Sequence, residues 1–88
     1  VMAEAIQDQN LHVIIRNRSK TYFDGKAKTV TSTNATGMFD VLYLHANFIT
    51  MIQQFVIVKT PDDKEQKFEI KGGVLRVLGE TVDIYLTV

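Results

Sequence analysis

Cysteine is absent from the 88 residues, and the 10 basic and 10 acidic side chains leave no net formal charge. Without cysteine, neither a disulfide nor a cysteine metal site can form, which fits a reducing compartment. Without an excess of charge, a general electrostatic hold on nucleic acid or anionic lipid is not expected. No apolar run approaches the ~20 residues that span a bilayer, and the first residues lack a signal-peptide pattern. Nucleic-acid binding and direct membrane insertion are therefore not expected.

Residue patterns that carry chemistry are also lacking. The two histidines, His12 and His45, are too few and too far apart in the sequence for a zinc site, which needs three or four ligands. Asp62-Asp63 is too short for a calcium loop, and no helical pattern follows Gly72-Gly73 to make a phosphate site. No nucleophile is matched with a histidine and an acid. The sequence therefore predicts no catalytic residue, no cofactor site and no metal site.

What the sequence does contain is repeated strand-like alternation. Apolar and polar residues alternate in Leu11–Arg16 and again in Thr81–Val88. The stretch Gly37–Ile52 holds two apolar runs, Met38–Leu44 and Phe48–Ile52, which meet at a short polar corner. Several short strands separated by turn signals are typical of an antiparallel sandwich or barrel. We predict one all-β domain, an antiparallel β-sandwich of two packed sheets.

Turn-forming residues divide the rest of the chain. A strand over Lys20–Phe23 is expected to end in a tight turn at Asp24-Gly25, because glycine accepts a positive φ angle. A threonine-rich strand over Lys26–Thr33 follows that turn. Pro61–Lys64 is predicted to be a polar turn, and Lys71–Gly73 a second corner. These signals set the expected order of strands.

Domain bounds and core follow from the same pattern. Residues 1–10 are expected to be a loosely held arm or a remnant of expression, and residues 11–88 the folded domain. The side chains expected to include most of the core are Phe39, Val41, Ile49, Ile57, Phe68, Leu75 and Ile84.

Two short motifs carry a resemblance to a known family. Phe39–Leu42 leads to His45-Ala46, and Gly73–Val77 follows near the end of the chain. In this order and spacing they resemble the N-terminal β-sandwich domain of the ε subunit of F-type ATP synthases, over Leu11 to about Leu86. Neither motif is catalytic. The resemblance implies a sandwich without chemistry of its own.

The chain departs from the family pattern at two corners. Tyr43-Leu44 stands where the family usually has Pro-Gly, and Gln53–Phe55 stands where it usually has Lys-Pro-Gly or similar. Both changes remove residues with special backbone preferences. The C-terminal helical hairpin of the family, which regulates ATP hydrolysis in relatives, has no counterpart before Val88. We expect this polypeptide to lack the inhibitory action of that hairpin.

The resemblance implies a rotor component on the cytoplasmic side of an energy-transducing membrane, peripheral as part of the complex. One face of the sandwich would contact the γ subunit, through the first strand and the segment after His45. One end would meet the polar loops of the c-ring, through Asn34–Gly37 and Leu42–His45. The candidate contact residues are Ile14, Arg16, Asn34, Thr36, Leu42, Tyr43, Leu44 and His45.

Several interpretations remain open at this point. A stand-alone β-sandwich protein-interaction module outside the synthase is the main alternative, and a small enzyme is a third class that lacks candidate residues. His45 is either a structural hydrogen-bonding residue or a partner contact. At the corner, Leu44 either packs inward or stands exposed with Tyr43 as a contact patch, and we expect the exposed arrangement. Such a patch would favour weak self-association of the isolated domain.

Overall fold

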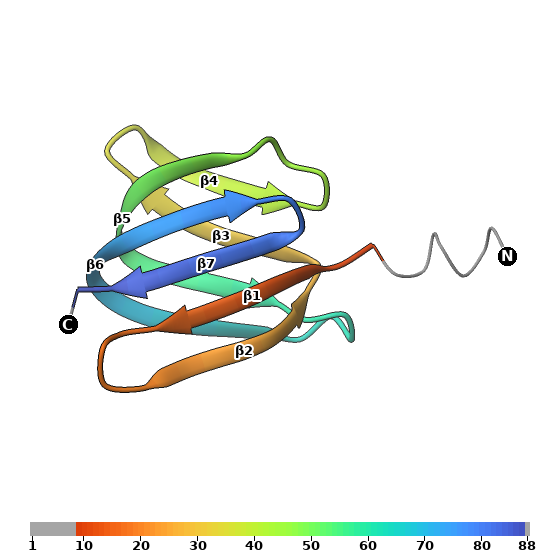
Figure 1. Ribbon diagram of the computed structural model, residues 1–88, viewed down its shortest axis with the longest axis horizontal. Helices are drawn as coiled ribbons and strands as arrows, with labels where there is room; N and C mark the ends of the chain where they lie inside the picture. Colours follow the sequence, from red (N-terminus) through yellow and green to blue (C-terminus); the bar gives the residue numbers. More distant parts are fainter. Residues whose placement is uncertain (1–8, 88) are drawn as a thin grey trace, which may run out of the picture.

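The computed structural model describes residues 9–87, which form seven β-strands and no helix (Figure 1). The strands are β1 (Leu11–Arg16), β2 (Thr21–Ala27), β3 (Thr29–Asn34), β4 (Gly37–Leu42), β5 (Phe48–Lys59), β6 (Glu65–Leu78) and β7 (Thr81–Leu86). The all-β prediction is confirmed for this part of the chain. The arm predicted over residues 1–10 lies, apart from its last two residues, outside the described residues, as does Val88.

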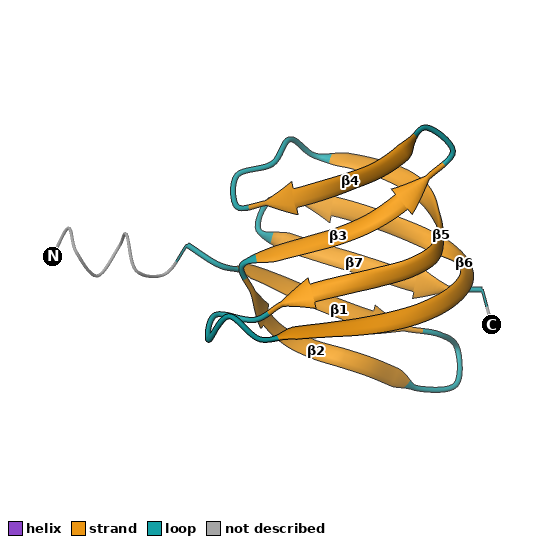
Figure 2. Ribbon diagram, turned by 180° about the vertical axis from the view of Figure 1, so that it is seen from behind, coloured by secondary structure: helices purple, strands orange, loops and turns teal. Residues whose placement is uncertain are grey.

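Hydrogen bonds join the strands into one continuous sheet in the order β2-β1-β7-β6-β5-β3-β4. All neighbours are antiparallel except β1 and β7, which run parallel. Two separate, wholly antiparallel sheets are therefore not confirmed. Instead the long strands β5 and β6 bend, and the sheet folds over into two layers (Figure 2).

The two layers share the β5–β6 hairpin. The first layer comprises β2, β1, β7, residues 73–78 of β6 and residues 48–52 of β5. The second layer comprises β4, β3, residues 54–59 of β5 and residues 65–70 of β6. In Figure 1 the first layer faces the viewer, and Figure 2 shows the second layer from behind.

Alternating residues fill the space between the layers. In β1 and β7 every second side chain is buried, as the sequence pattern predicts for half-buried strands. Each large aliphatic side chain removed from water stabilises the fold by about 1.5–3 kcal/mol. The fully buried side chains with the largest volumes are Leu11, Ile15, Leu75, Ile84, Val13, Val30, Val41, Val56, Val58, Val77 and Val82.

Two aromatic pairs connect the layers at their open edges. Phe23 on β2 meets Phe68 on β6 edge to face, with 6.3 Å between ring centroids. Phe39 on β4 meets Phe48 on β5 in the same manner, at 6.0 Å. Neither pair lies on hydrogen-bonded neighbouring strands, so each links the two layers of the folded sheet. Such pairs contribute about 0.5–1.5 kcal/mol beyond the area they bury.

The bend of the hairpin has identifiable causes. Pairing of β5 with β6 is irregular between Ile52 and Gln54, and Gln54 has a positive φ of 76°. On β6, Gly73 passes so close to β7 that a Cβ atom there would lie 2.7 Å from the carbonyl oxygen of Tyr85. Only glycine permits this approach. The sequence predicted a corner at Lys71–Gly73, but the strand continues through it.

The predicted tight turn at Asp24-Gly25 is also wrong, because both residues lie inside β2. Gly25 pairs with Val13, and the Asp24 carboxylate lies 2.7 Å from His12 Nε2 across the strand pair. The chain leaves β2 at Lys28 and crosses directly to the second layer as β3. Because β2 and β3 lie in different layers, no hairpin turn connects them. The Asp24-Gly25 pair, which often forms such a turn, is part of a strand here.

The predicted core is right in part. Val41, Leu75 and Ile84 are fully buried, and Phe39 and Phe68 pack against the core with part of their surface exposed. Ile49 is 65% exposed and does not belong to the core. Ile57 is half-buried and faces outward, because its neighbours Val56 and Val58 supply the inward side chains of β5. Both errors have one cause: the prediction placed odd-numbered residues of β5 in the core, whereas the even-numbered residues face it.

Alanine substitutions should separate these positions. Phe68→Ala or Phe39→Ala should lower the free energy of unfolding by about 3 kcal/mol, because each removes half of a layer-bridging pair. That corresponds to a fall in Tm of more than about 10 °C for a domain of this size. Ile49→Ala should change the free energy of unfolding by no more than about 0.5 kcal/mol. Thermal denaturation would contradict the core assignment if Ile49→Ala were the most damaging of the three.

Candidate partner interface

The outer surfaces of the two layers differ in character. The second layer presents threonines of β3, the exposed Met38 and Leu42 of β4, and a mixture of charges from β4, β5 and β6. The first layer presents a set of apolar side chains that no part of the described chain covers. This set, called the apolar face below, consists of Ile14, Ile49, Met51, Val74 and Tyr85.

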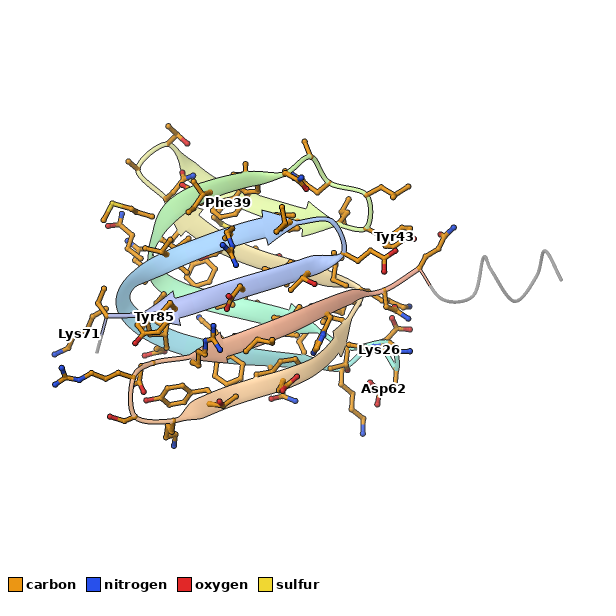
Figure 3. The ribbon with its side chains drawn as sticks, in the orientation of Figure 1. Lys26, Phe39, Tyr43, Asp62, Lys71 and Tyr85 are labelled. Atoms are coloured by element: carbon orange, nitrogen blue, oxygen red, sulfur yellow. The ribbon has the colours of Figure 1, made fainter. Side chains whose placement is uncertain are left out.

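Strand register assembles the apolar face from residues far apart in the sequence. Met51 pairs with Val74, Val74 with Tyr85, and Tyr85 with Arg16, which gives one row across four strands. Side chains directly opposite one another on neighbouring strands lie about 4.5–5.5 Å apart at Cβ. Met51 is 75% exposed. Figure 3 shows Tyr85 near the arrowhead of β7.

A second row places charges in the middle of the apolar face. Ile49 pairs with Arg76, Arg76 with Asp83, and Asp83 with Ile14. Asp83 Oδ2 lies 3.3 Å from the Nη2 atom of Arg16 and 3.6 Å from that of Arg76. The Asp83 side chain is 22% exposed, whereas the arginine side chains are 46% and 55% exposed. One carboxylate therefore lies beneath two outward-facing guanidinium groups.

The structure brings together the residues expected to face one partner. The row that contains Ile14 ends at Ile49, and the row that contains Arg16 ends at Met51. Ile49 and Met51 belong to the segment after His45. The sequence suggested both segments but not that they lie in the same rows of the sheet. The residues between them in these rows lie on β6 and β7. They face outward because Leu75 on β6 and Ile84 on β7 face the core.

The residues expected at the other contact do not share one end. Asn34 and Thr36 lie at the turn where β4 begins, whereas Leu42–His45 starts at Leu42, the last residue of β4. A six-residue strand separates them by about 20 Å at ~3.3 Å per residue. The two loops lie at opposite ends of the layers (Figure 1). The expectation that both belong to a single end is therefore wrong.

The β3–β4 turn is held by one asparagine. The Asn34 side-chain oxygen accepts hydrogen bonds from the Thr36 backbone N–H at 2.9 Å and from its hydroxyl at 2.7 Å. The Asn34 amide nitrogen donates to the Thr50 hydroxyl at 3.2 Å, which ties the turn to β5. Thr36 itself is exposed. The turn is thus a small, polar and well-anchored projection.

At the opposite end, the Tyr43–His45 corner leaves Leu44 exposed. Leu44 is 77% exposed and has a φ of 69°, a left-handed conformation that leucine disfavours. The Tyr43 hydroxyl donates to Glu80 at 3.2 Å. The His45 ring lies 4.9 Å from the Phe48 ring, which gives it a structural contact. The expected exposed arrangement is right for Leu44 only: Tyr43 is half-buried, and Leu44 does not lie beside the β3–β4 turn.

The β5–β6 turn carries charges that are tied to each other. Asp63 accepts a hydrogen bond from the Lys28 ammonium at 2.7 Å, which lowers the pKa of that carboxyl. A hydrogen bond from the Thr60 hydroxyl lowers the pKa of Asp62. Among the described residues, no three histidine or acidic side chains gather closely enough to hold a metal ion. Within residues 9–87, no helix has the length and apolar character needed to cross a membrane.

The sequence is similar to a known family of domains and to several known proteins. The model of the ATP synthase Delta/Epsilon chain beta-sandwich domain matches residues 10–87. ATP synthase epsilon chains of Helicobacter acinonychis (strain Sheeba) and Helicobacter pylori (strain ATCC 700392 / 26695) are each 36% identical over 62 residues. Each match covers 70% of this chain and 50% of the relative. The chain thus spans about half the length of the curated relatives it matches.

Solved structures with the same fold include two ATP synthases. A chain of the Euglena gracilis mitochondrial ATP synthase, OSCP/F1/c-ring, matches with a TM-score of 0.84 and 17% identity, over 91% of this chain and 52% of that one. A chain of the central stalk/c-ring of the Tetrahymena thermophila mitochondrial enzyme matches with a TM-score of 0.74 and 14% identity, over 89% and 63%. At these identities, the two structures show that this chain shares their fold, that is, the arrangement of the strands.

The backbone at Leu44 allows a test with a matched control. Leu44→Gly should raise the free energy of unfolding by about 0.5–1 kcal/mol, because glycine removes the left-handed strain and an exposed side chain loses little packing. Leu42→Gly, also at an exposed leucine but inside β4, should lower it by about 1 kcal/mol. Chemical denaturation measures both. Equal destabilisation by the two substitutions would contradict the backbone account of this corner.

Proposed function

Because the chain belongs to the ATP synthase Delta/Epsilon chain beta-sandwich domain family, we propose that it acts as a non-catalytic rotor component of an F-type ATP synthase. In this role it couples the γ subunit to the membrane c-ring during proton-driven ATP synthesis. It sits on the cytoplasmic side of the membrane as a peripheral part of the complex. It needs no cofactor, since its task is to transmit rotation through two protein contacts.

The apolar face carries this proposal. Ile49 and Met51 are 65% and 75% exposed, and Val74 and Tyr85 continue the same surface across β6 and β7. A contiguous apolar surface on a small domain commonly marks a protein-binding site. The γ subunit is the partner that fits a rotor role, and it would cover this face.

The β3–β4 turn is the better candidate for the c-ring contact. Asn34 anchors it through three hydrogen bonds, and Thr36 projects from it. A polar, anchored turn suits contact with the polar loops of another subunit. Leu42–His45 lies at the opposite end of β4 from this turn and is not part of the proposed c-ring contact. The apolar face and the turn occupy different parts of the same rigid sandwich.

Two methionines provide a matched test of the γ-facing surface. Met51 on the apolar face is 75% exposed, and Met38 on the outer side of the second layer is 71% exposed. Met51→Asp should weaken binding to the purified γ subunit by at least about tenfold, because it places an unpaired charge in the interface. Met38→Asp should leave the affinity within about twofold. Calorimetric titration measures both.

The same titration separates the alternatives. If Met38→Asp weakened binding and Met51→Asp did not, the second layer would be the γ-facing surface. If the unmodified domain did not bind γ at all, the rotor role would be wrong, and a stand-alone interaction module would be favoured.

Single cysteines test the c-ring contact, since the chain has no cysteine of its own. Thr36→Cys, at the β3–β4 turn, should form a disulfide with a cysteine placed in the polar loop of subunit c in the assembled synthase. Ala46→Cys, exposed at the opposite end, should not. Non-reducing electrophoresis after mild oxidation reports the product. Cross-linking through Ala46→Cys alone would place the other end of the sandwich against the ring.

A further inference from the structure

Charge in the middle of the apolar face is unbalanced. Arg16 and Arg76 both approach the same oxygen of Asp83, at 3.3 and 3.6 Å. The other carboxylate oxygen, Oδ1, is buried and has no hydrogen-bond partner. Two guanidinium groups thus share one carboxylate, which leaves one positive charge in excess. Each guanidinium carries five N–H donors, and in each it is Nη2 that approaches Asp83.

Covering the apolar face would remove water from these donors. A charged group that loses water without gaining a partner costs several kcal/mol, so an apolar partner alone is a poor match. A carboxylate forms paired hydrogen bonds with a guanidinium group and supplies the missing negative charge. A second copy of this chain is also a poor match through this face, because it would bring a second positive excess against the first.

The surface around the cluster has room for such a group. Arg76, Asp83 and Tyr85 line a shallow depression of about 220 Å³ on the apolar face. A second depression of about 450 Å³, lined by Arg18 and Tyr85 among others, adjoins it. Arg16 and Arg18 make this side of the face basic.

We propose that the apolar face recognises a γ-subunit surface carrying one acidic side chain, which enters beside Tyr85 and pairs with the guanidinium group of Arg76. This inference rests on the proposed rotor function and adds to it the chemistry of the contact. Ile49, Met51 and Val74 supply the apolar surroundings that exclude water. The carboxylate fixes the orientation of the partner, as charged groups at interfaces commonly do.

Charge variants of Arg76 test this assignment against matched variants of Lys67. Lys67 is an exposed cation of β6 on the outer side of the second layer. With purified γ subunit, Arg76→Gln should weaken binding about tenfold or more, and Arg76→Glu about 100-fold or more. Lys67→Gln and Lys67→Glu should each stay within about twofold. Because the Arg76 side chain is 55% exposed, its variants should keep the Tm of the unmodified domain, which serves as the control for intact folding.

Rescue identifies the partner group. Among single Asp→Lys and Glu→Lys variants of γ, at least one should bind the Arg76→Glu domain more tightly than it binds the unmodified domain. If γ binds and Arg76→Gln leaves the affinity unchanged, or if no γ variant rescues Arg76→Glu, the acidic contact is wrong while the rotor role stands. Absence of any γ binding overturns both proposals, whereas self-association that depends on Arg76 overturns the acidic contact alone.

Discussion

The bend of the β5–β6 hairpin is the constraint on which the rest of the structure depends. Strands β5 and β6 run through both layers. The two layers can therefore pack face to face only if both strands bend at paired positions. Gly73 makes this possible, since a side chain there would collide with the carbonyl of Tyr85. The positive φ of Gln54 accommodates the bend on β5. The hydrophobic core and the two aromatic pairs follow from the alignment that this bend imposes.

Alternation along β5 decides which side chains reach the outside. Ile49 and Met51 face outward, whereas Ile52 before the bend and Val56 and Val58 after it face inward. The apolar residues left outside on the first layer cannot reach the core. Their exposure has an energetic cost in the isolated domain that a partner would relieve. A rigid sandwich with one apolar face and one anchored polar turn is suited to holding two other subunits at a fixed angle.

Local patterns predicted much of the fold but not the contacts between distant strands. The alternation in Leu11–Arg16 specified a strand and its buried side, because one face of that strand packs on the core. The Asp24-Gly25 signal failed because sequence cannot distinguish a hairpin from a strand that crosses between layers. For the proposed interface, family resemblance suggested Ile14 and Arg16. The sequence did not suggest Asp83, since its contacts with Arg16 and Arg76 arise only when β7 aligns between β1 and β6.

The central claim is that the first layer, and not the second, faces the γ subunit. Methionine methyl signals in an NMR spectrum report this directly, because Met51 and Met38 are similarly exposed on opposite layers. The signals are assigned by single substitutions and followed as unlabelled γ subunit is added to domain labelled at its methionine methyl groups. The account predicts that the Met51 signal shifts or broadens while the Met38 signal keeps its position. A shift of Met38 with Met51 unchanged would contradict it.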